Sequence, residues 1–291
     1  VDDFSKGKKS NLKKSINDIE IREGNLENFS FVKKALLGSK TIFHLASRAY
    51  GIGYSQNNHL ISLIHNEKIT NNLLEYFTEK PLERLLITSS SCVYSDDGPD
   101  IIAEDHVING KPELANFGYG LSKIYLEEKF KLLAETKKFK LSVVRPFNIY
   151  GERYNWAGEN SQAIPMLVKK ILDKNNPIIV WGSGEQCRTY LHADDCARIM
   201  KIILQNGYTE GPVNIGLDKT ISIKDLVNLI CKVNKIYPKI KFDKTKPEGR
   251  FVKRSDTSKL KNILCRHKIS ETNLEAGLKK MSQWYYENFK K

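Results

Sequence analysis

The chain has 291 residues, of which 40% are hydrophobic and 28% are charged. This balance is typical of a folded globular protein and excludes a disordered or fibrous one, and the length predicts one large domain or two closely joined domains. No apolar run approaches the roughly 20 residues that a membrane helix requires. The first ten residues are charged and lack the apolar core of a secretory signal. We therefore expect a cytoplasmic protein with no membrane partner.

The formal net charge of +13 is compatible with an anionic partner. The sequence has no zinc-finger spacing, no basic region followed by heptads and no basic–aromatic RNA-binding signature, so nucleic acid is not the expected partner. The lysines are scattered through helical segments, which is typical of a solvated surface, and a phosphate-bearing substrate also fits them. Five cysteines without a CxxC pair indicate a reducing compartment and predict neither a disulfide framework nor a metal site.

Short apolar runs alternate along the chain with amphipathic helical segments. The pattern predicts, in chain order, a helix over 28–38, a strand over 41–46, a helix over 59–78, a strand over 84–88, a helix over 120–137, a strand over 140–145, helices over 161–174 and 193–206, a strand over 212–216 and a helix over 222–234. Such alternation is typical of an α/β protein with a doubly wound parallel sheet. From about residue 217 the chain mixes helices with a short strand, KIKFD, which indicates a smaller lobe.

Residues that can carry chemistry follow three of the predicted strands. Ala46 and Ser47 follow the first, the segment 89–92 follows the second, and the segment 146–148 follows the third. Ligands of open α/β sheets bind outside the carboxyl ends of the strands. We therefore expect these segments to border one site.

Tyr119 and Lys123 form the sharpest single motif, YGLSK, near the start of a predicted helix. A spacing of four residues places both side chains on one helical face, one turn apart. A lysine ammonium beside a phenol favours the phenolate and is expected to lower the pKa of Tyr119. Such a tyrosine can take a proton from a sugar hydroxyl while a hydride leaves the same carbon.

Ten stretches of the chain together resemble a known family. They are, in order, VDDFSKG, GNLEN, FHLASRA, HNEKITNNLLE, LLITSSSCVY, YGLSK, RPFNIYG, VWGSGEQCRTYLHADDCA, PVNIG and KPEGRFVKRSDTSKL. Their order, over nearly the whole chain, resembles that of the extended short-chain dehydrogenase/reductases of the NAD-dependent epimerase/dehydratase family, which act on nucleotide sugars. The resemblance implies a Rossmann-like dinucleotide-binding domain of residues 1–147 and roughly 189–216, and a nucleotide-sugar-binding lobe of residues 148–188 and 217–291.

The resemblance also implies a catalytic set, a cofactor site and a homodimer. Ser90 corresponds to the hydroxyl that bonds the reacting sugar oxygen, Tyr119 to the acid/base and Lys123 to its electrostatic partner. The cofactor-binding positions are Asp2, Asn25, Leu26, Leu45, Ala46, Ser47, Asn66, Thr88, Tyr119, Lys123 and Pro146. The homodimer pairs the 59–78 and 120–137 helices of two subunits in a four-helix bundle, with Leu126, Phe130 and Leu133 as an expected apolar stripe.

The cofactor implied is NAD, because a carboxylate at Asp2 grips the adenosine ribose hydroxyls and repels a 2′-phosphate. An epimerase returns the hydride that it removes, whereas a net reductase normally draws on NADPH, so Asp2 favours an epimerase. Two features depart from the family. Asn25 stands where an Asp is usual, and the GxxGxxG turn that meets the pyrophosphate is absent, as if the first βα unit were missing from a fragment or a truncated gene.

The partner implied is a nucleotide-diphosphate sugar. The resemblance assigns its binding to Ser90, Ser91, Asn148, Gln162, Ala163, Arg188 and Arg254. Asn148 corresponds to the amide that holds the sugar or its phosphate, and the guanidinium fork of Arg188 suits the diphosphate. Arg254 is expected to make a second diphosphate or ribose contact.

Cys92 and Gln162 leave the reaction open. SSSCVY resembles the GDP-mannose 3,5-epimerase and GDP-L-fucose synthase subfamilies, in which a cysteine at this position abstracts the proton beside a 4-keto group, and it lacks the acidic pair of the dehydratases. Gln162 stands where those enzymes have a basic residue, and an amide cannot donate a proton in that way. We therefore expect an NAD-dependent nucleotide-sugar epimerase. The alternatives are a GDP-sugar 3,5-epimerase or epimerase/reductase that uses Cys92, and an inactive truncated member of the fold.

Overall fold

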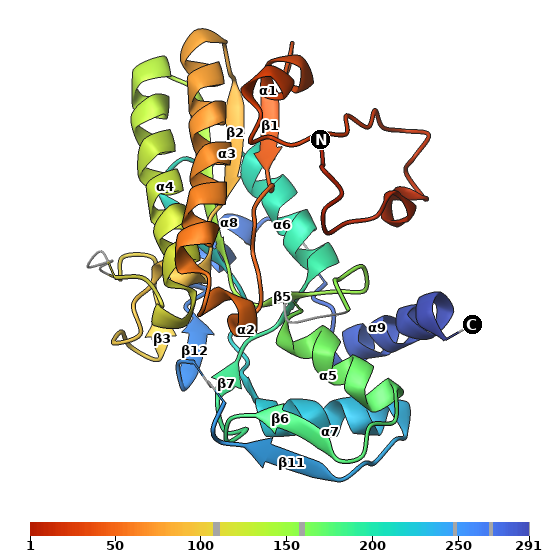
Figure 1. Cartoon of the computed structure of the whole chain (residues 1–291). Coiled ribbons are helices and arrows are strands. Elements are labelled where there is room, and N and C mark those ends of the chain that lie inside the picture. Colours follow the sequence, from red (N-terminus) through yellow and green to blue (C-terminus); the bar gives the residue numbers. More distant parts are fainter. Residues whose placement is uncertain (107–110, 157–160, 247–248, 268–269, 291) are drawn as a thin grey trace.

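A four-stranded parallel sheet lies at the centre of the computed structural model, which describes residues 1–106, 111–156, 161–246, 249–267 and 270–290. Its strands are β1 (Thr41–His44), β2 (Arg84–Thr88), β4 (Lys140–Pro146) and β9 (Pro212–Ile215), in the order β1-β2-β4-β9. Every neighbouring pair is parallel. The four strands predicted from the apolar runs are confirmed, and so is the α/β class (Figure 1).

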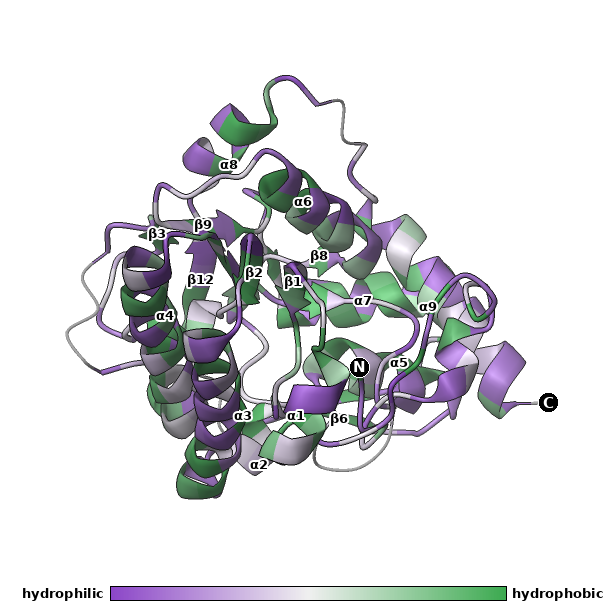
Figure 2. Cartoon of the chain, turned by 90° about the horizontal axis from the view of Figure 1, so that it is seen from above, coloured by the Kyte–Doolittle hydropathy of each residue, from purple (hydrophilic) through white to green (hydrophobic). Residues whose placement is uncertain are grey.

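Helices cover both faces of this sheet because the side chains of each strand alternate between them. Leu85 and Ile87 of β2 pack with α1 (Phe29–Ala35), α3 (His59–Glu79) and α4 (Phe117–Lys137). Leu86, between them, packs on the opposite face with α6 (Ala193–Gln205) and α8 (Ser258–Leu264). Seen from above, the strands lie between α3 and α4 on one side and α6 on the other (Figure 2). The doubly wound arrangement is confirmed.

The expected apolar stripe on α4 is wrong in its residues. Leu126, Phe130 and Leu133 are buried in the core of the chain itself, against β2 and α3, because the inner face of α4 needs apolar side chains to cover the sheet. The exposed apolar residues of the two long helices are Leu60, Ile61 and Ile64 on α3 and Tyr125 and Leu132 on α4. α3 and α4 lie side by side along their length (Figure 1).

A second apolar core lies away from the sheet. It joins α5 (Ala163–Leu172), α7 (Ile223–Asn234) and α9 (Leu274–Phe289) with the parallel pair β6 (Ile178–Trp181) and β11 (Ile240–Asp243). Stacked aromatic rings of Trp156 and Trp284, 5.8 Å between centroids, close this core at α9. These elements lie together at the lower end of the view in Figure 1, apart from α3 and α4.

Short elements connect the two cores. They are α2 (Ile52–Ser55), β3 (Ile101–Ile102), β5 (Ile149–Tyr150), β7 (Cys187–Arg188), β8 (Leu191–His192), β10 (Ile221–Ser222), β12 (Val252–Ser255) and the 3-10 helices η1 (Lys9–Leu12), η2 (Ser91–Val93) and η3 (Leu114–Asn116). β12 lies between β7 and β3 in a small mixed sheet with the order β10-β7-β12-β3. Across the described ranges, no helix combines the length and the apolarity that crossing a membrane demands.

Candidate active site

A cavity of about 870 Å³ opens at the carboxyl ends of the central strands. Leu45 follows β1, Thr88 ends β2 and Pro146 ends β4, and all three residues line the cavity. The position is the one that an open α/β sheet gives to its ligands. The cavity continues between the sheet and the second core, since residues of α5 and β6 also line it.

Glycines bring the start of α4 against the segment that follows β2. A Cβ atom on Gly120 would lie 2.5 Å from the carbonyl oxygen of Cys92, so only glycine allows this approach. The close packing places the Tyr119 hydroxyl within hydrogen-bonding reach of the Ser47 and Ser90 side chains. Ser90 is itself fixed, because its Oγ accepts a hydrogen bond of 3.1 Å from the Cys92 amide. The two side chains thus lie close enough for the predicted Tyr119–Ser90 partnership, which stays a prediction.

Lys123 lies one helical turn beyond Tyr119 and is buried beneath the cavity. Its ammonium donates a hydrogen bond of 2.8 Å to the Thr88 carbonyl and lies 5.5 Å from the centre of the Tyr119 ring. Burial lowers the pKa of Lys123 to about 8, although the charge of Glu127 acts in the opposite direction. The hydrogen bond to Thr88 at the end of β2 thus helps to position the Lys123 ammonium, in addition to its contact with the Tyr119 ring.

The pKa of Tyr119 shifts in the direction opposite to the one expected from its spacing to Lys123. Burial raises it, and the hydrogen bonds from Ser47 and Ser90 lower it only in part. The physical reason is that a phenolate at this depth loses its hydration. In the structure as described, Tyr119 is therefore a protonated phenol that can donate a hydrogen bond into the cavity.

Most of the residues predicted for the substrate line the same cavity. They are Ser90, Ser91, Asn148, Gln162, Ala163 and Arg188. Asn148 has a positive φ of 42°, and its buried Nδ2 lacks a hydrogen-bond partner among the described residues. A buried amide donor without a partner is the kind of group that a ligand satisfies. The structure does not bring Arg254 to the cavity wall, because alternation along β12 turns its neighbour Lys253 there instead.

A buried ion pair lies beside Cys92 in the cavity wall. The Lys253 ammonium is 3.0 Å from a carboxylate oxygen of Glu113 and 4.0 Å from the Cys92 Sγ. The Glu113 backbone amide donates to the Cys92 carbonyl at 3.1 Å, and Asn116 donates to the Glu113 carboxylate at 3.1 Å. Burial opposes the ionisation of Glu113, yet Lys253 holds the pKa of its carboxyl at about 2. The pair is therefore charged within the cavity wall.

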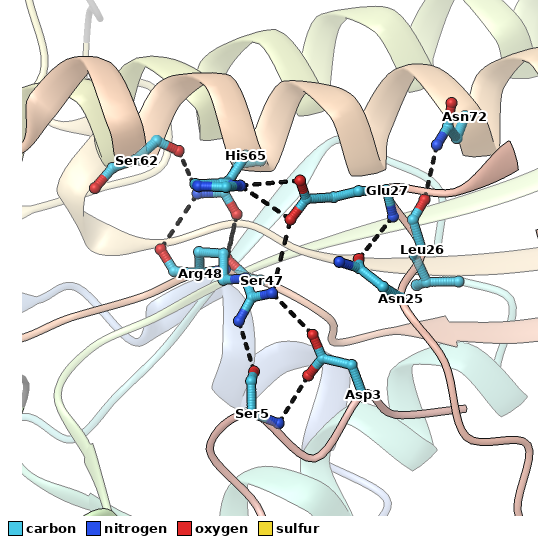
Figure 3. Close-up of polar contacts among 11 residues, drawn as sticks. Asp3, Ser5, Asn25, Leu26, Glu27, Ser47, Arg48, Ser62, His65 and Asn72 are labelled. Atoms are coloured by element: carbon cyan, nitrogen blue, oxygen red, sulfur yellow. Dashed lines mark hydrogen bonds and ion pairs between the residues drawn. The ribbon is translucent and has the colours of Figure 1, made fainter.

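A separate polar cluster that the sequence does not predict lies beside Asn25 and Leu26, two of the residues expected at the adenosine end of a dinucleotide (Figure 3). Arg48, which follows β1 and Ser47, donates to Asp3 at 2.8 Å and to Ser5 at 2.6 Å, and lies 3.7 Å from Glu27. Glu27 in turn bonds His65 of α3 at 2.9 Å. This network ties the N-terminal segment to the loop after β1 and to α3.

The remaining predicted cofactor positions flank this cluster. The Gly24 amide donates to the Asp2 carbonyl at 3.0 Å, which holds Asp2 against the segment that leads into Asn25 and Leu26. Asn66 on α3 accepts hydrogen bonds of 2.9 Å from the Ser47 hydroxyl and from the Arg48 amide, and so fixes the loop that also contains Ala46. The structure thus places Asp2 beside the segment 23–26 and Ser47 beside Asn66, and their roles in cofactor binding stay predictions.

The residues present fit a dinucleotide at both of its ends. At the nicotinamide end, the buried Thr88 Oγ1 has no hydrogen-bond partner among the described residues, and the Lys123 ammonium, Tyr119 and Pro146 lie around it. At the other end, the Asp2 carboxylate is exposed and accepts a hydrogen bond of 2.7 Å from the nearby Phe4 amide. Unsatisfied polar groups at the sheet edge and an exposed carboxylate are suited to hold a ribose and its neighbours.

Glu113 and Lys253 are the functional residues that sequence reasoning missed. Lys253 stands in the stretch KPEGRFVKRSD, where the resemblance assigns the substrate contact to its neighbour Arg254. In β12 the Lys253 side chain is buried and the Arg254 side chain is only partly buried. This difference depends on how β12 pairs with its neighbouring strands, and a pattern of residues alone does not predict that pairing. Glu113 precedes the Tyr119 helix in PELAN and matches no motif.

Comparison with known proteins identifies relatives of this chain. Residues 1–216 match the family described as the NAD dependent epimerase/dehydratase family. GDP-L-colitose synthase of Yersinia pseudotuberculosis is 29% identical over 251 residues, which is 84% of this chain and 80% of that protein. GDP-L-fucose synthase of Escherichia coli is 29% identical over 259 residues, with the same two coverages.

Solved structures share the fold across almost the entire chain. The UDP-N-acetylglucosamine 4-epimerase of Methanobrevibacter ruminantium superposes with a TM-score of 0.88 at 24% identity, over 99% of this chain and 90% of that one. The UDP-glucose 4-epimerase of Thermotoga maritima gives 0.84 at 20% identity over the same shares. These likenesses confirm the Rossmann-like fold class, and together with the match over residues 1–216 they show that the chain belongs to the NAD dependent epimerase/dehydratase family.

Proposed function

We propose that the protein is an NAD-dependent nucleotide-sugar epimerase that works through a transient keto-sugar. The observation that supports this proposal is the grouping of Tyr119, Ser90 and Ser47 in hydrogen-bonding reach at the large cavity, with the Lys123 ammonium beneath them. In this proposal Tyr119 exchanges a proton with a sugar hydroxyl: the ionised side chain takes the proton as a hydride leaves the same carbon, and the protonated phenol, the form in the structure described, returns it when the hydride comes back. Ser90 donates a hydrogen bond to the reacting oxygen. Bound NAD supplies the acceptor for that hydride and its return.

The substrate class that we propose is a nucleoside-diphosphate sugar. The Arg188 guanidinium and the unpartnered Asn148 amide in the cavity wall support a diphosphate or a sugar hydroxyl there. GDP-sugars are the first substrates to test, because the two synthases named above are named for GDP-sugars. UDP-sugars are the second, because the two superposed epimerases are named for them.

NAD rather than NADP stays a proposal that depends on Asp2. Its carboxylate is exposed beside the segment 23–26, where a 2′-phosphate would meet a negative charge. Solved relatives are described both with NADP and with NADPH, so the preference needs its own measurement. Saturation curves with the two cofactors, on wild type and on Asp2→Asn, provide it.

A second candidate function is favoured by one specific observation. The Cys92 thiol lines the cavity close to a lysine ammonium. A thiol in such surroundings is suited to remove the proton from a carbon beside a 4-keto group. In this candidate, the enzyme inverts the carbon next to the keto group, and a reduction can follow. Gln162 in the same cavity argues against a two-base inversion, since its amide is not an acid.

Turnover in heavy water separates the two candidates. Candidate GDP-, UDP- and dTDP-hexoses, with their 4-keto derivatives, are incubated with the enzyme and NAD, and deuterium is located by NMR. A simple 4-epimerase returns the hydride to its own carbon, so the ring carbons should stay free of deuterium and Cys92→Ser should be nearly silent. Deuterium at C3 or C5 that disappears in Cys92→Ser would replace our first candidate by the second. No conversion of any hexose, with NAD or NADP, would contradict both.

A further inference from the structure

Three charged or ionisable groups from different parts of the chain meet at one point of the cavity wall. Cys92 follows β2, Glu113 precedes α4, and Lys253 lies on β12. The ammonium of Lys253 lies 3.0 Å from the Glu113 carboxylate and 4.0 Å from the Cys92 Sγ, and the thiol is also within hydrogen-bonding reach of the Glu113 carboxylate. The exposed fraction of Glu113 is 6% and that of Lys253 is 5%. The function assigned to Tyr119 and Ser90 makes no use of this ion pair.

We propose that Lys253 is the cation that favours the thiolate of Cys92, and that Glu113, paired with Lys253, is the carboxylate that restrains this effect. The chemical consequence rests on the second candidate function above. A thiolate so formed takes a proton from the sugar carbon beside a keto group, and the electron pair of that C–H bond moves onto the keto oxygen. The proton then resides on sulfur and can exchange with solvent. Lys253 and Glu113 act through Cys92 and are therefore positioning residues.

The location of the pair argues against a purely structural role. A buried ion pair is a poor source of stability, because the desolvation of two charges offsets their attraction. Here both charged groups line the cavity of about 870 Å³, whose size suits a nucleotide sugar. Their backbone neighbourhood is also tied to the thiol, since the Glu113 amide donates to the Cys92 carbonyl. The ion pair and the Cys92 thiol thus lie together in one part of the cavity wall.

The charges near Cys92 act in opposite directions. Burial raises the pKa of the thiol to about 12, Lys253 lowers it and Glu113 raises it. Tyr119 and Lys123 of α4 also interact electrostatically with the thiol, and Arg188 of β7 acts on Lys253. Removing Lys253 and removing Glu113 should therefore change the reactivity of the sulfur with opposite signs. If the ion pair served only to stabilise the fold, removing its two members would not change the reactivity of Cys92 in opposite directions.

Alkylation of Cys92 by iodoacetamide tests the proposal on the intact chain. The rate follows the thiolate fraction, and mass spectrometry separates the Cys92 peptide from those of Cys187 and Cys265. At a fixed pH of about 8.5, a neighbouring charge worth one pKa unit changes the rate about tenfold. We expect Glu113→Gln to accelerate alkylation about tenfold and Lys253→Gln to slow it about tenfold. Lys253→Arg, which keeps the charge, should stay close to wild type.

Matched variants keep the test decisive. Lys253→Gln leaves a buried carboxylate unpaired and can unfold the chain, so the lysine is also removed in the Glu113→Gln background, where no such charge remains. The double variant should react about tenfold more slowly than Glu113→Gln alone. Lys170→Gln, at another cavity lysine, is the control and should leave the rate unchanged.

Two results would overturn the proposal. One is a Cys92 rate that responds to neither Glu113→Gln nor the double variant while both fold. The other is an equal response to Lys170→Gln. The assay needs neither sugar nor cofactor, so it is independent of turnover. Opposite shifts in alkylation without deuterium exchange in any 4-keto sugar would support the pair and reject the second candidate function.

Discussion

Both carboxylate oxygens of Glu127 accept hydrogen bonds from Arg145, beneath the carboxyl ends of β2 and β4. The Arg145 Nε and one terminal nitrogen donate to the two oxygens at 2.9 and 2.6 Å. Glu127 also accepts from the Ser89 hydroxyl, next to Ser90, and it lies on α4 one further turn beyond Lys123. The other Arg145 nitrogen donates to Tyr94 at 2.9 Å. One buried ion pair thus joins the helix of Tyr119 to the strand ends that border the cavity.

Glu127→Gln should strongly destabilise the chain. The change leaves the Arg145 guanidinium buried and unpaired, which costs about 3–5 kcal/mol of unfolding free energy. Urea denaturation measures this loss. Glu83→Gln, which removes the exposed partner of Lys40, is the control and should fall within about 0.5 kcal/mol of wild type. Equal losses in the two variants would contradict the role given to the buried pair.

Tyr119→Phe should remove most of the activity and leave the fold intact. The phenylalanine keeps the ring in its packed position and loses only the hydroxyl that meets Ser47 and Ser90. Acid/base groups of this kind contribute about 10²-fold or more to kcat. Steady-state kinetics with the best nucleotide sugar measures the effect. Tyr125→Phe, on the exposed side of the same helix, should be silent, and full activity in Tyr119→Phe would remove the proposed mechanism.

The sheet and its site could be predicted because local signals and fold agree there. The apolar runs that became β2, β4 and β9 are short and buried on two faces, which is the pattern that a parallel sheet needs, and the short run of β1 lies at the edge of the sheet, partly exposed. The YxxxK spacing placed Tyr119 and Lys123 on the correct helix, and strand ends placed Ser90 and Pro146 at the cavity.

The other features of the site and of α4 depend on contacts between residues far apart in the chain, which local patterns in the sequence do not predict. Lys253 and Glu113 meet across 140 positions of chain, and neither belongs to a pattern with a chemical spacing. Leu126 is expected in an apolar surface stripe of the 120–137 helix, yet the packed structure shows that Leu126 is buried and that Leu132 is exposed instead. The division of the chain into a cofactor domain and a sugar lobe stays a prediction, supported by the separate core around α5, α7 and α9.

Dimerisation is predicted to use the exposed faces of α3 and α4. Leu60 is 67% exposed and Leu132 is 63% exposed, on two long helices that lie side by side. Burying such a face against its copy is the common way to build a four-helix interface. Light scattering after size-exclusion chromatography should show a dimer at micromolar concentration, and Leu60→Glu with Leu132→Glu should give a monomer.

The control for dimerisation is Leu37→Glu, at a residue that is 70% exposed just after α1 and outside the proposed interface. This variant should remain dimeric. A wild-type monomer, or dissociation in the Leu37 variant as well, would show that the two helices do not form the interface.

The buried ammonium of Lys123 predicts a distinct pH dependence of stability. Its pKa is lowered from 10.5 to about 8, chiefly by burial. Between these two values the unfolded chain binds more protons than the folded one, so this residue makes the unfolding free energy rise with pH. Below about pH 8 the folded chain must hold the buried charge. The cost of that charge is therefore fully present at pH 7 and fades as the pH approaches 10.5.

Lys123→Met isolates this effect, because the variant keeps the length of the side chain without its charge. The variant should be most favoured over wild type below about pH 8, and its relative stability should fall by about 3 kcal/mol between pH 8 and 10.5. Urea denaturation of both proteins across this range measures the difference. Lys201→Met, at an exposed residue of α6, is the control, and its difference from wild type should stay flat. A flat difference for Lys123→Met as well would mean that the lysine is not held as a buried cation, and its proposed support of Tyr119 would then need another basis.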